Sequence, residues 1–231
     1  MGLVLHWLYL MRWMDWILNR CPSCGLSAMV ICRRCWLRLN PEGSPQNLIV
    51  TETRPFSQRT LYLWDDRIES SADVIRELIL SSKKKPSRDL MRLWAGEFHR
   101  RVVLEGTSSN YRGWLVVPAP GRSGVGELDH AGMLAEEIAK AWGSDLIFAG
   151  DALERVSDHA SQKLKSKKER GERKYRTTSF WGESIRTAPG ILFVDDVIVT
   201  GSTAKAAWEA LGRPLEYECW AVTFKAETLA D

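Results

Sequence analysis

The pattern of apolar and polar residues changes along the chain, and this change predicts an α/β fold. In the first half, the pattern predicts a strand over 59–64 and helices over 71–80 and 88–104. From residue 114 onward, short apolar runs alternate with helical segments, which is typical of βαβ units and of a mainly parallel sheet with flanking helices. The strands expected there are 114–118, 146–149, 191–194 and 218–224, and the helices are 131–142 and 203–211.

The length of 231 residues suits one well-packed domain with a small additional module. Hydrophobic residues make up 45% of the chain and charged residues 26%, which argues against a disordered or fibrous protein. The turn-rich stretch 40–45 interrupts any helix or strand and predicts the boundary between the two parts. We therefore expect an N-terminal module over 1–45 and a main domain over 46–231.

Residues 1–18 are apolar, but they predict neither a membrane span nor a signal peptide. Arg12 and Asp15 interrupt the run, and no small-residue cleavage site follows it. We expect an amphipathic or partly buried helix that docks on the main domain, with membrane-surface contact through its tryptophans as the alternative. The sequence therefore predicts a protein without a transmembrane segment.

Four of the five cysteines have the spacing of a zinc site. Cys21, Cys24, Cys32 and Cys35 form two C-x-x-C pairs separated by seven residues. Each pair sets two thiolates on one side of a turn, and two pairs complete the tetrahedral site of a zinc ribbon, whose role is structural. The alternative is a reduced redox pair. Clustered thiols of this kind are typical of a reducing compartment, so we expect a cytoplasmic protein.

The strand expected at 191–194 leads into residues that suit a ribose phosphate. Asp195 and Asp196 follow it, and residues 200–203, Thr-Gly-Ser-Thr, begin the next helix. At the carboxyl edge of a parallel sheet, two carboxylates can accept hydrogen bonds from ribose hydroxyls and hold a water-bridged Mg²⁺ ion. A glycine turn at a helix N-terminus forms a phosphate cradle. The expected ligand site comprises Val194, Asp195, Asp196, Thr200, Gly201, Ser202 and Thr203.

A strand that ends in two aspartates also occurs in other Mg²⁺-binding folds, but the loop at 200–203 distinguishes this chain from them. The ten residues 194–203 resemble the phosphoribosyl pyrophosphate motif of type I phosphoribosyltransferases. The order of apolar segment, cysteine cluster and this motif resembles the ComF family, which is associated with natural competence and DNA uptake in bacteria. Residues 117–120, Val-Pro-Ala-Pro, match that family's strand end, and residues 155–170 are similar to its lid segment.

The resemblance implies a type I phosphoribosyltransferase-like fold, a phosphoribosyl pyrophosphate ligand bound with Mg²⁺, and catalytic roles for Asp195 and Asp196. One stretch differs from the family. Residues 126–131 read Gly-Glu-Leu-Asp-His-Ala where the family has Arg-Gly-Phe-Asn-Gln-Ala, and Arg122 is the cation left in the loop that would hold the pyrophosphate. We therefore include Arg122 in the ligand site and expect catalysis to be weak or lost. Asp129 is either the N-cap of the next helix or a catalytic residue.

Residues 163–176 are strongly basic, with eight lysines and arginines and two glutamates. A charged run of this kind is usually a solvated loop, and in this fold it would be a lid over the active site. Its charge and Tyr175 also suit the phosphates and bases of single-stranded DNA. The residues expected to contact DNA are Lys165, Lys167, Lys168 and Arg170.

Two functions fit these features. The first is a ComF-like protein that binds phosphoribosyl pyrophosphate or a ribose phosphate and serves DNA uptake, with single-stranded DNA and competence-machinery proteins as partners. The second is an active phosphoribosyltransferase of nucleotide metabolism, whose acceptor base no motif identifies.

Overall fold

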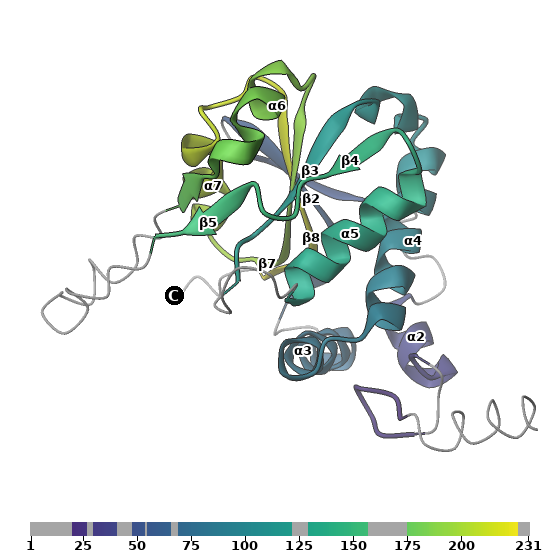
Figure 1. Cartoon of the computed structure of the whole chain (residues 1–231). Coiled ribbons are helices and arrows are strands. Elements are labelled where there is room, and N and C mark those ends of the chain that lie inside the picture. Colours follow the sequence, from purple (N-terminus) through teal and green to yellow (C-terminus); the bar gives the residue numbers. More distant parts are fainter. Residues whose placement is uncertain are drawn as a thin grey trace, which may run out of the picture.

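A six-stranded mixed sheet lies at the centre of the computed structural model, with helices on both faces (Figure 1). The structure describes residues 20–26, 30–40, 48–53, 55–65, 69–121, 129–156 and 175–225. The strand order is β1-β2-β8-β7-β3-β4, and every neighbouring pair is parallel except β1 and β2. The strands of this sheet are β1 (Ile49–Thr53), β2 (Phe56–Trp64), β3 (Trp114–Pro118), β4 (Leu146–Phe148), β7 (Ile191–Ile198) and β8 (Tyr217–Lys225).

Alternate residues of the central strands point to opposite faces, and each face has its own buried core. On one face, Val116, Leu192 and Trp220 pack with α3, α4 and α5. On the other, Val117, Phe193 and the sheet residues beside them pack with α6 and α7. These helices are α3 (Glu69–Lys84), α4 (Arg88–Leu104), α5 (His130–Trp142), α6 (Gly182–Thr187) and α7 (Ser202–Ala210).

This architecture confirms the expected α/β class and the mainly parallel sheet with flanking helices. The helix expected at 71–80 is longer, because the basic residues that follow form its last turn, where cations stabilise the helix dipole. The strand expected at 191–194 also continues, to Ile198, because it keeps pairing with β8. Shorter elements were not expected: β1, α2 (Arg33–Leu39), α6, and a separate antiparallel pair of β5 (Leu153–Arg155) and β6 (Tyr175–Thr177).

The sheet topology reverses direction between β3 and β7. After β3 the chain passes to β4 on one side, and it returns to β7 on the other. The pairing of β3 with β7 ends at Pro118 and Val194, whereas β7 remains paired with β8 as far as Ile198. The end of β7 therefore extends beyond β3, at a switch point where open α/β sheets bind ligands.

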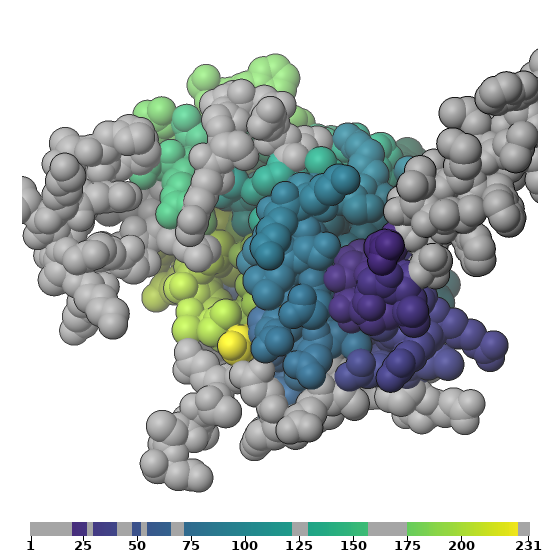
Figure 2. Space-filling model, turned by 90° about the horizontal axis from the view of Figure 1, so that it is seen from below, coloured from purple at the N-terminus to yellow at the C-terminus, as the bar shows by residue number. Residues whose placement is uncertain are grey.

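The cysteine-containing module packs against the main domain. Cys21, Cys35 and Leu39 belong to the same buried cluster as Ile75 and Leu78 of α3, and helix α2 contacts α3 directly. Figure 2 shows the purple residues of this module against the blue helical region. Among the described helices, none is both long and apolar enough to cross a membrane. The helix expected within residues 1–18 lies outside the described residues.

Candidate functional site

The four clustered cysteines come together in a small knuckle followed by a helix. The backbone N–H of Gly25 donates to the carbonyl of Cys21, which closes the first turn, and Gly25 has a positive φ of 74°. Cys32 is the N-cap of α2, and Cys35 lies in its first turn. The local sequence therefore brings one pair of thiols from a turn and the other from a helix start.

The positions of these thiols suit a metal ion such as zinc. Their four Sγ atoms all lie within 4.8 Å of one another, and those of Cys24 and Cys32 are 3.4 Å apart. A tetrahedral zinc ion with Zn–S bonds of about 2.3 Å needs sulfur atoms about 3.8 Å apart, so the cluster needs little adjustment. Burial alone would raise the pKa of Cys21, but backbone N–H groups of Cys32, Cys24 and Ser23 lower it to about 7. These donors favour the thiolate of Cys21, whereas burial raises the pKa of Cys35 to about 12, so a bound metal would have to displace the Cys35 proton.

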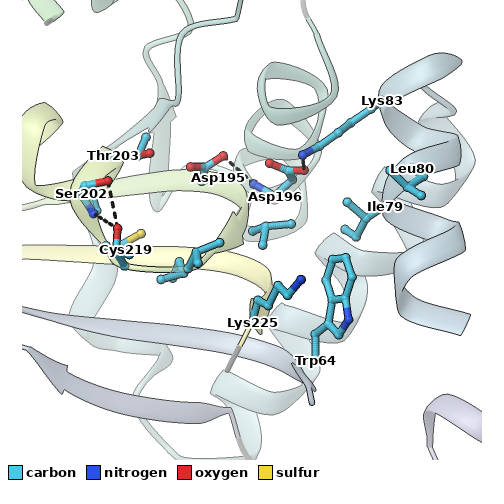
Figure 3. A pocket seen from close by; sticks show the side chains of 16 residues that line it. Trp64, Ile79, Leu80, Lys83, Asp195, Asp196, Ser202, Thr203, Cys219 and Lys225 are labelled. Atoms are coloured by element: carbon cyan, nitrogen blue, oxygen red, sulfur yellow. Dashed lines mark hydrogen bonds and ion pairs between the residues drawn. The ribbon is translucent and has the colours of Figure 1, made fainter. Parts of the chain in front are cut away.

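A second site lies at the carboxyl end of β7, in a cleft with a volume of about 380 Å³ (Figure 3). Its polar side is the continuous segment from Asp195 to Thr203, and its opposite wall comes from α3 and from the ends of β2 and β8. This volume falls at the small end of ligand pockets, which suits a compact, polar molecule. The cleft coincides with the switch point of the sheet.

The loop between β7 and α7 has the geometry of an anion cradle. Gly201 is the N-cap of α7 and has a φ of 71°, in the left-handed region that favours glycine. A Cβ at this position would collide with the side-chain amide of Gln58, a buried residue of β2. The Thr200 hydroxyl lies 3.0 Å from the Ser202 hydroxyl and accepts the backbone N–H of Ser202. Backbone and hydroxyl donors therefore gather at the positive end of the α7 dipole.

The two aspartates lie between this loop and α3 (Figure 3). Asp195 is 8% and Asp196 is 7% exposed, which is low for carboxylates. Oδ1 of Asp195 accepts the backbone N–H of Asp196 at 2.8 Å, which holds the first side chain in place. Both carboxylates thus stand at the edge of the sheet with little contact with bulk water.

Two residues that sequence reasoning did not assign to the site contact Asp196. Lys83 Nζ forms an ion pair with Asp196 Oδ2 at 2.7 Å, and His130 Nε2 lies 3.5 Å from the same oxygen. Burial by itself would raise the pKa of Asp196, but His130 and the charge of Lys83 hold it well below its usual range. Burial likewise opposes protonation of His130, yet Asp196 outweighs it and raises the pKa of His130. The carboxylate is therefore strongly held in its charged form.

The far wall of the cleft is mainly apolar, and Lys225 adds a second cation to Lys83. Trp64, Ile79 and Leu80 line it, together with Lys225 from the end of β8. Lys225 Nζ lies 4.7 Å from the centroid of the Trp64 ring, a cation–π arrangement. No signal in the sequence points to these residues, because they come from three elements that only the fold brings together.

The structure brings most of the expected ligand residues together. Asp195, Asp196 and residues 200–203 line one cleft, and Val194 lies directly before them in the buried part of β7. Asp129 is the N-cap of α5, where its side chain accepts the backbone N–H of Gly132 at 3.0 Å. Arg122 and the basic residues expected to contact DNA lie outside the described residues: Lys165, Lys167, Lys168 and Arg170.

Comparison with protein-family models gives no match, and no curated protein sequence is significantly similar to this chain.

Proposed function

We propose that the chain binds phosphoribosyl pyrophosphate or a related ribose phosphate in the cleft at the end of β7. One observation carries the proposal. Two buried carboxylates and a glycine-containing anion cradle follow each other in the chain and line the same small cleft, at the switch point of a mainly parallel sheet. A ribose phosphate needs acceptors for its hydroxyls and donors for its phosphate, and this cleft offers both within one segment.

In this mode, the 5-phosphate binds at the N-terminus of α7, where the N–H groups and hydroxyls of residues 200–203 gather. The ribose hydroxyls donate to Asp195 and Asp196, which are both shielded from water, and Asp196 is held in its charged form. Hydrogen bonds to ionised acceptors are roughly twice as strong as neutral ones, so this pair would contribute much of the affinity.

Magnesium is part of the proposal. Carboxylate oxygens are the ligands that Mg²⁺ prefers, and the cleft has two such groups. Oδ2 of Asp196 already has Lys83 and His130 as neighbours. We therefore expect Mg²⁺ to be held mainly through water and the bound ligand, where it would offset the negative charge of a diphosphate.

The ComF-like arrangement of a cysteine module and a phosphoribosyltransferase-like domain supports a role in DNA uptake, in the cytoplasm, for a protein that uses this site mainly for binding. The alternative is an active phosphoribosyltransferase. Oxocarbenium-like chemistry would need little beyond the ribose contacts, Mg²⁺ and exclusion of water. The stretch at 126–131, which lacks the family's arginine, favours the binding role.

Calorimetric titration with ribose 5-phosphate and with phosphoribosyl pyrophosphate, each with Mg²⁺, tests the proposal. Changing Asp195 and Asp196 together to alanine should weaken binding by about 2–4 kcal/mol, because charged acceptors for two hydroxyls are lost. Asp145→Ala is the control, since Asp145 precedes β4 at the opposite edge of the sheet. Unchanged affinity in the double variant would place the ligand elsewhere, and absence of binding by the unmodified protein would refute the function.

A further inference from the structure

Two potential cations from different helices converge on one oxygen of the cleft. Oδ2 of Asp196 lies 2.7 Å from Lys83 Nζ and 3.5 Å from His130 Nε2. Lys83 belongs to the last turn of α3, and His130 is the first residue of α5. Lys83 and His130 therefore share one carboxylate oxygen, and Asp196 keeps a potential partner if Lys83 moves away.

The two cations differ in how far they can move. The side chain of Lys83 is 43% exposed, whereas that of His130 is 19% exposed. A lysine has a flexible four-carbon stem, so the ammonium group of Lys83 can turn away from Asp196 while its backbone stays in the helix. His130 is held by the start of α5 and stays next to the carboxylate. Lys83 can therefore exchange one anionic partner for another.

A bound ribose would bring about this exchange. If ribose hydroxyls donate to Asp196, as in the proposed function, they compete with Lys83 for the same carboxylate. Figure 3 shows Ser202 and Thr203 at one end of the cleft and Lys83 at the other, with Asp195 and Asp196 between them. A ligand with its phosphate at the α7 end and its ribose at the aspartates would therefore carry a second anionic group towards Lys83.

We propose that Lys83, with His130 beside it, forms the subsite for a diphosphate, the second anionic group of phosphoribosyl pyrophosphate. The inference rests on the proposed function and extends it to the part of the ligand that ribose 5-phosphate lacks. Lys83 comes from α3 and not from the loop after β3, so the site gains a cation that the altered stretch at 126–131 does not provide. The ion pair with Asp196 keeps Lys83 in the cleft until the ligand arrives.

Comparing two ligands in three variants isolates this subsite. Ribose 5-phosphate and phosphoribosyl pyrophosphate are titrated with Mg²⁺ into the unmodified protein, Lys83→Met and Lys84→Met. Lys84 is the matched control, because it is the next exposed residue of the same helix and does not line the cleft. The affinity for phosphoribosyl pyrophosphate relative to that for ribose 5-phosphate should fall about tenfold or more in Lys83→Met, since a charge-assisted contact to the diphosphate is lost. Affinity for ribose 5-phosphate should stay the same or rise.

Lys83→Arg completes the design by keeping the charge, and it should recover most of the lost relative affinity. An equal loss of affinity for both ligands, or no loss for either, in Lys83→Met would overturn the diphosphate subsite. A different result, in which the unmodified protein fails to bind ribose 5-phosphate, would instead count against the proposed function. The two failures are therefore distinguishable in one set of titrations.

Discussion

The two ends of α7 offer a direct test of how the anion cradle is built. Gly201 before the helix and Gly212 after it have similar positive φ angles, 71° and 85°. They differ in their surroundings, because a Cβ at Gly201 would collide with the amide of Gln58, whereas a Cβ at Gly212 would have nothing within 4 Å. Substituting each glycine by alanine therefore separates the cost of the backbone conformation from the cost of the collision.

The magnitudes follow from these surroundings. A residue with a Cβ in the left-handed region costs about 1–2 kcal/mol, and this should be the whole effect of Gly212→Ala on the free energy of unfolding. Gly201→Ala adds a shift of Gln58 Nε2, the far end of a flexible side chain, which costs about 1 kcal/mol more, at the low end of overpacking. We therefore expect a total loss of about 2–3 kcal/mol for Gly201→Ala.

Urea unfolding measures both losses, and titration with ribose 5-phosphate measures the effect on the cradle. Gly212→Ala should bind like the unmodified protein, whereas Gly201→Ala should bind more weakly because its loop must shift. Adding Gln58→Ala to Gly201→Ala should recover the collision part and leave the backbone part, which a double-mutant cycle resolves. Equal destabilisation by the two glycine substitutions, with normal ligand binding in both, would refute the idea that Gly201 and Gln58 shape the cradle.

Three further predictions concern other parts of the chain. Purified protein should contain about one zinc per chain, and zinc-free protein would contradict the zinc site. Cys21→Ser should abolish zinc binding, whereas Cys219→Ala, which changes the buried cysteine in β8, should leave the zinc content unchanged. Release of pyrophosphate from phosphoribosyl pyrophosphate should depend little or not at all on an added free base, and clear base-dependent turnover would favour the transferase. The binding constant for single-stranded DNA should fall with salt concentration with a log–log slope of roughly −3, because four or five phosphate contacts contribute about −0.7 each. A serine variant of the basic segment should flatten this slope, and an unchanged slope would mean that the segment is a lid and does not bind DNA. The serine variant changes Lys165, Lys167, Lys168 and Arg170.

The strands of the sheet core were predictable because they are buried on both faces. Runs such as 114–118 and 191–194 are continuously apolar, and a pattern of this kind distinguishes a central parallel strand from an edge strand. Short elements carried no such signal. β1, β5 and β6 lie at an edge or in a separate pair, and three to five residues are too few to give a clear period.

The residues of the candidate site likewise fall into a group that the sequence predicted and a group that it did not. Asp195, Asp196 and the loop at 200–203 were predictable as a group because they are contiguous, so a single strand–loop–helix unit places them together. Lys83 and His130 were not, since α3 and α5 reach the cleft only through the sheet topology. In the sequence, Lys83 is one of three successive lysines, and nothing local distinguishes it from its neighbours. Lys83 reaches the site only because the fold places the last turn of α3 beside the end of β7.

Helix α3 physically connects the cysteine module to the cleft. Ile75 and Leu78 in its middle share a buried cluster with Cys35 and Leu39 of α2, while its last turn carries Lys83 to Asp196. Figure 2 shows the blue helical region between the purple module and the yellow-green C-terminal residues. A metal ion that fixes α2 would therefore also restrain one face of α3. Because the last turn of that helix positions Lys83, we expect loss of the metal to loosen the proposed ligand site as well, through the packing of α2 on α3.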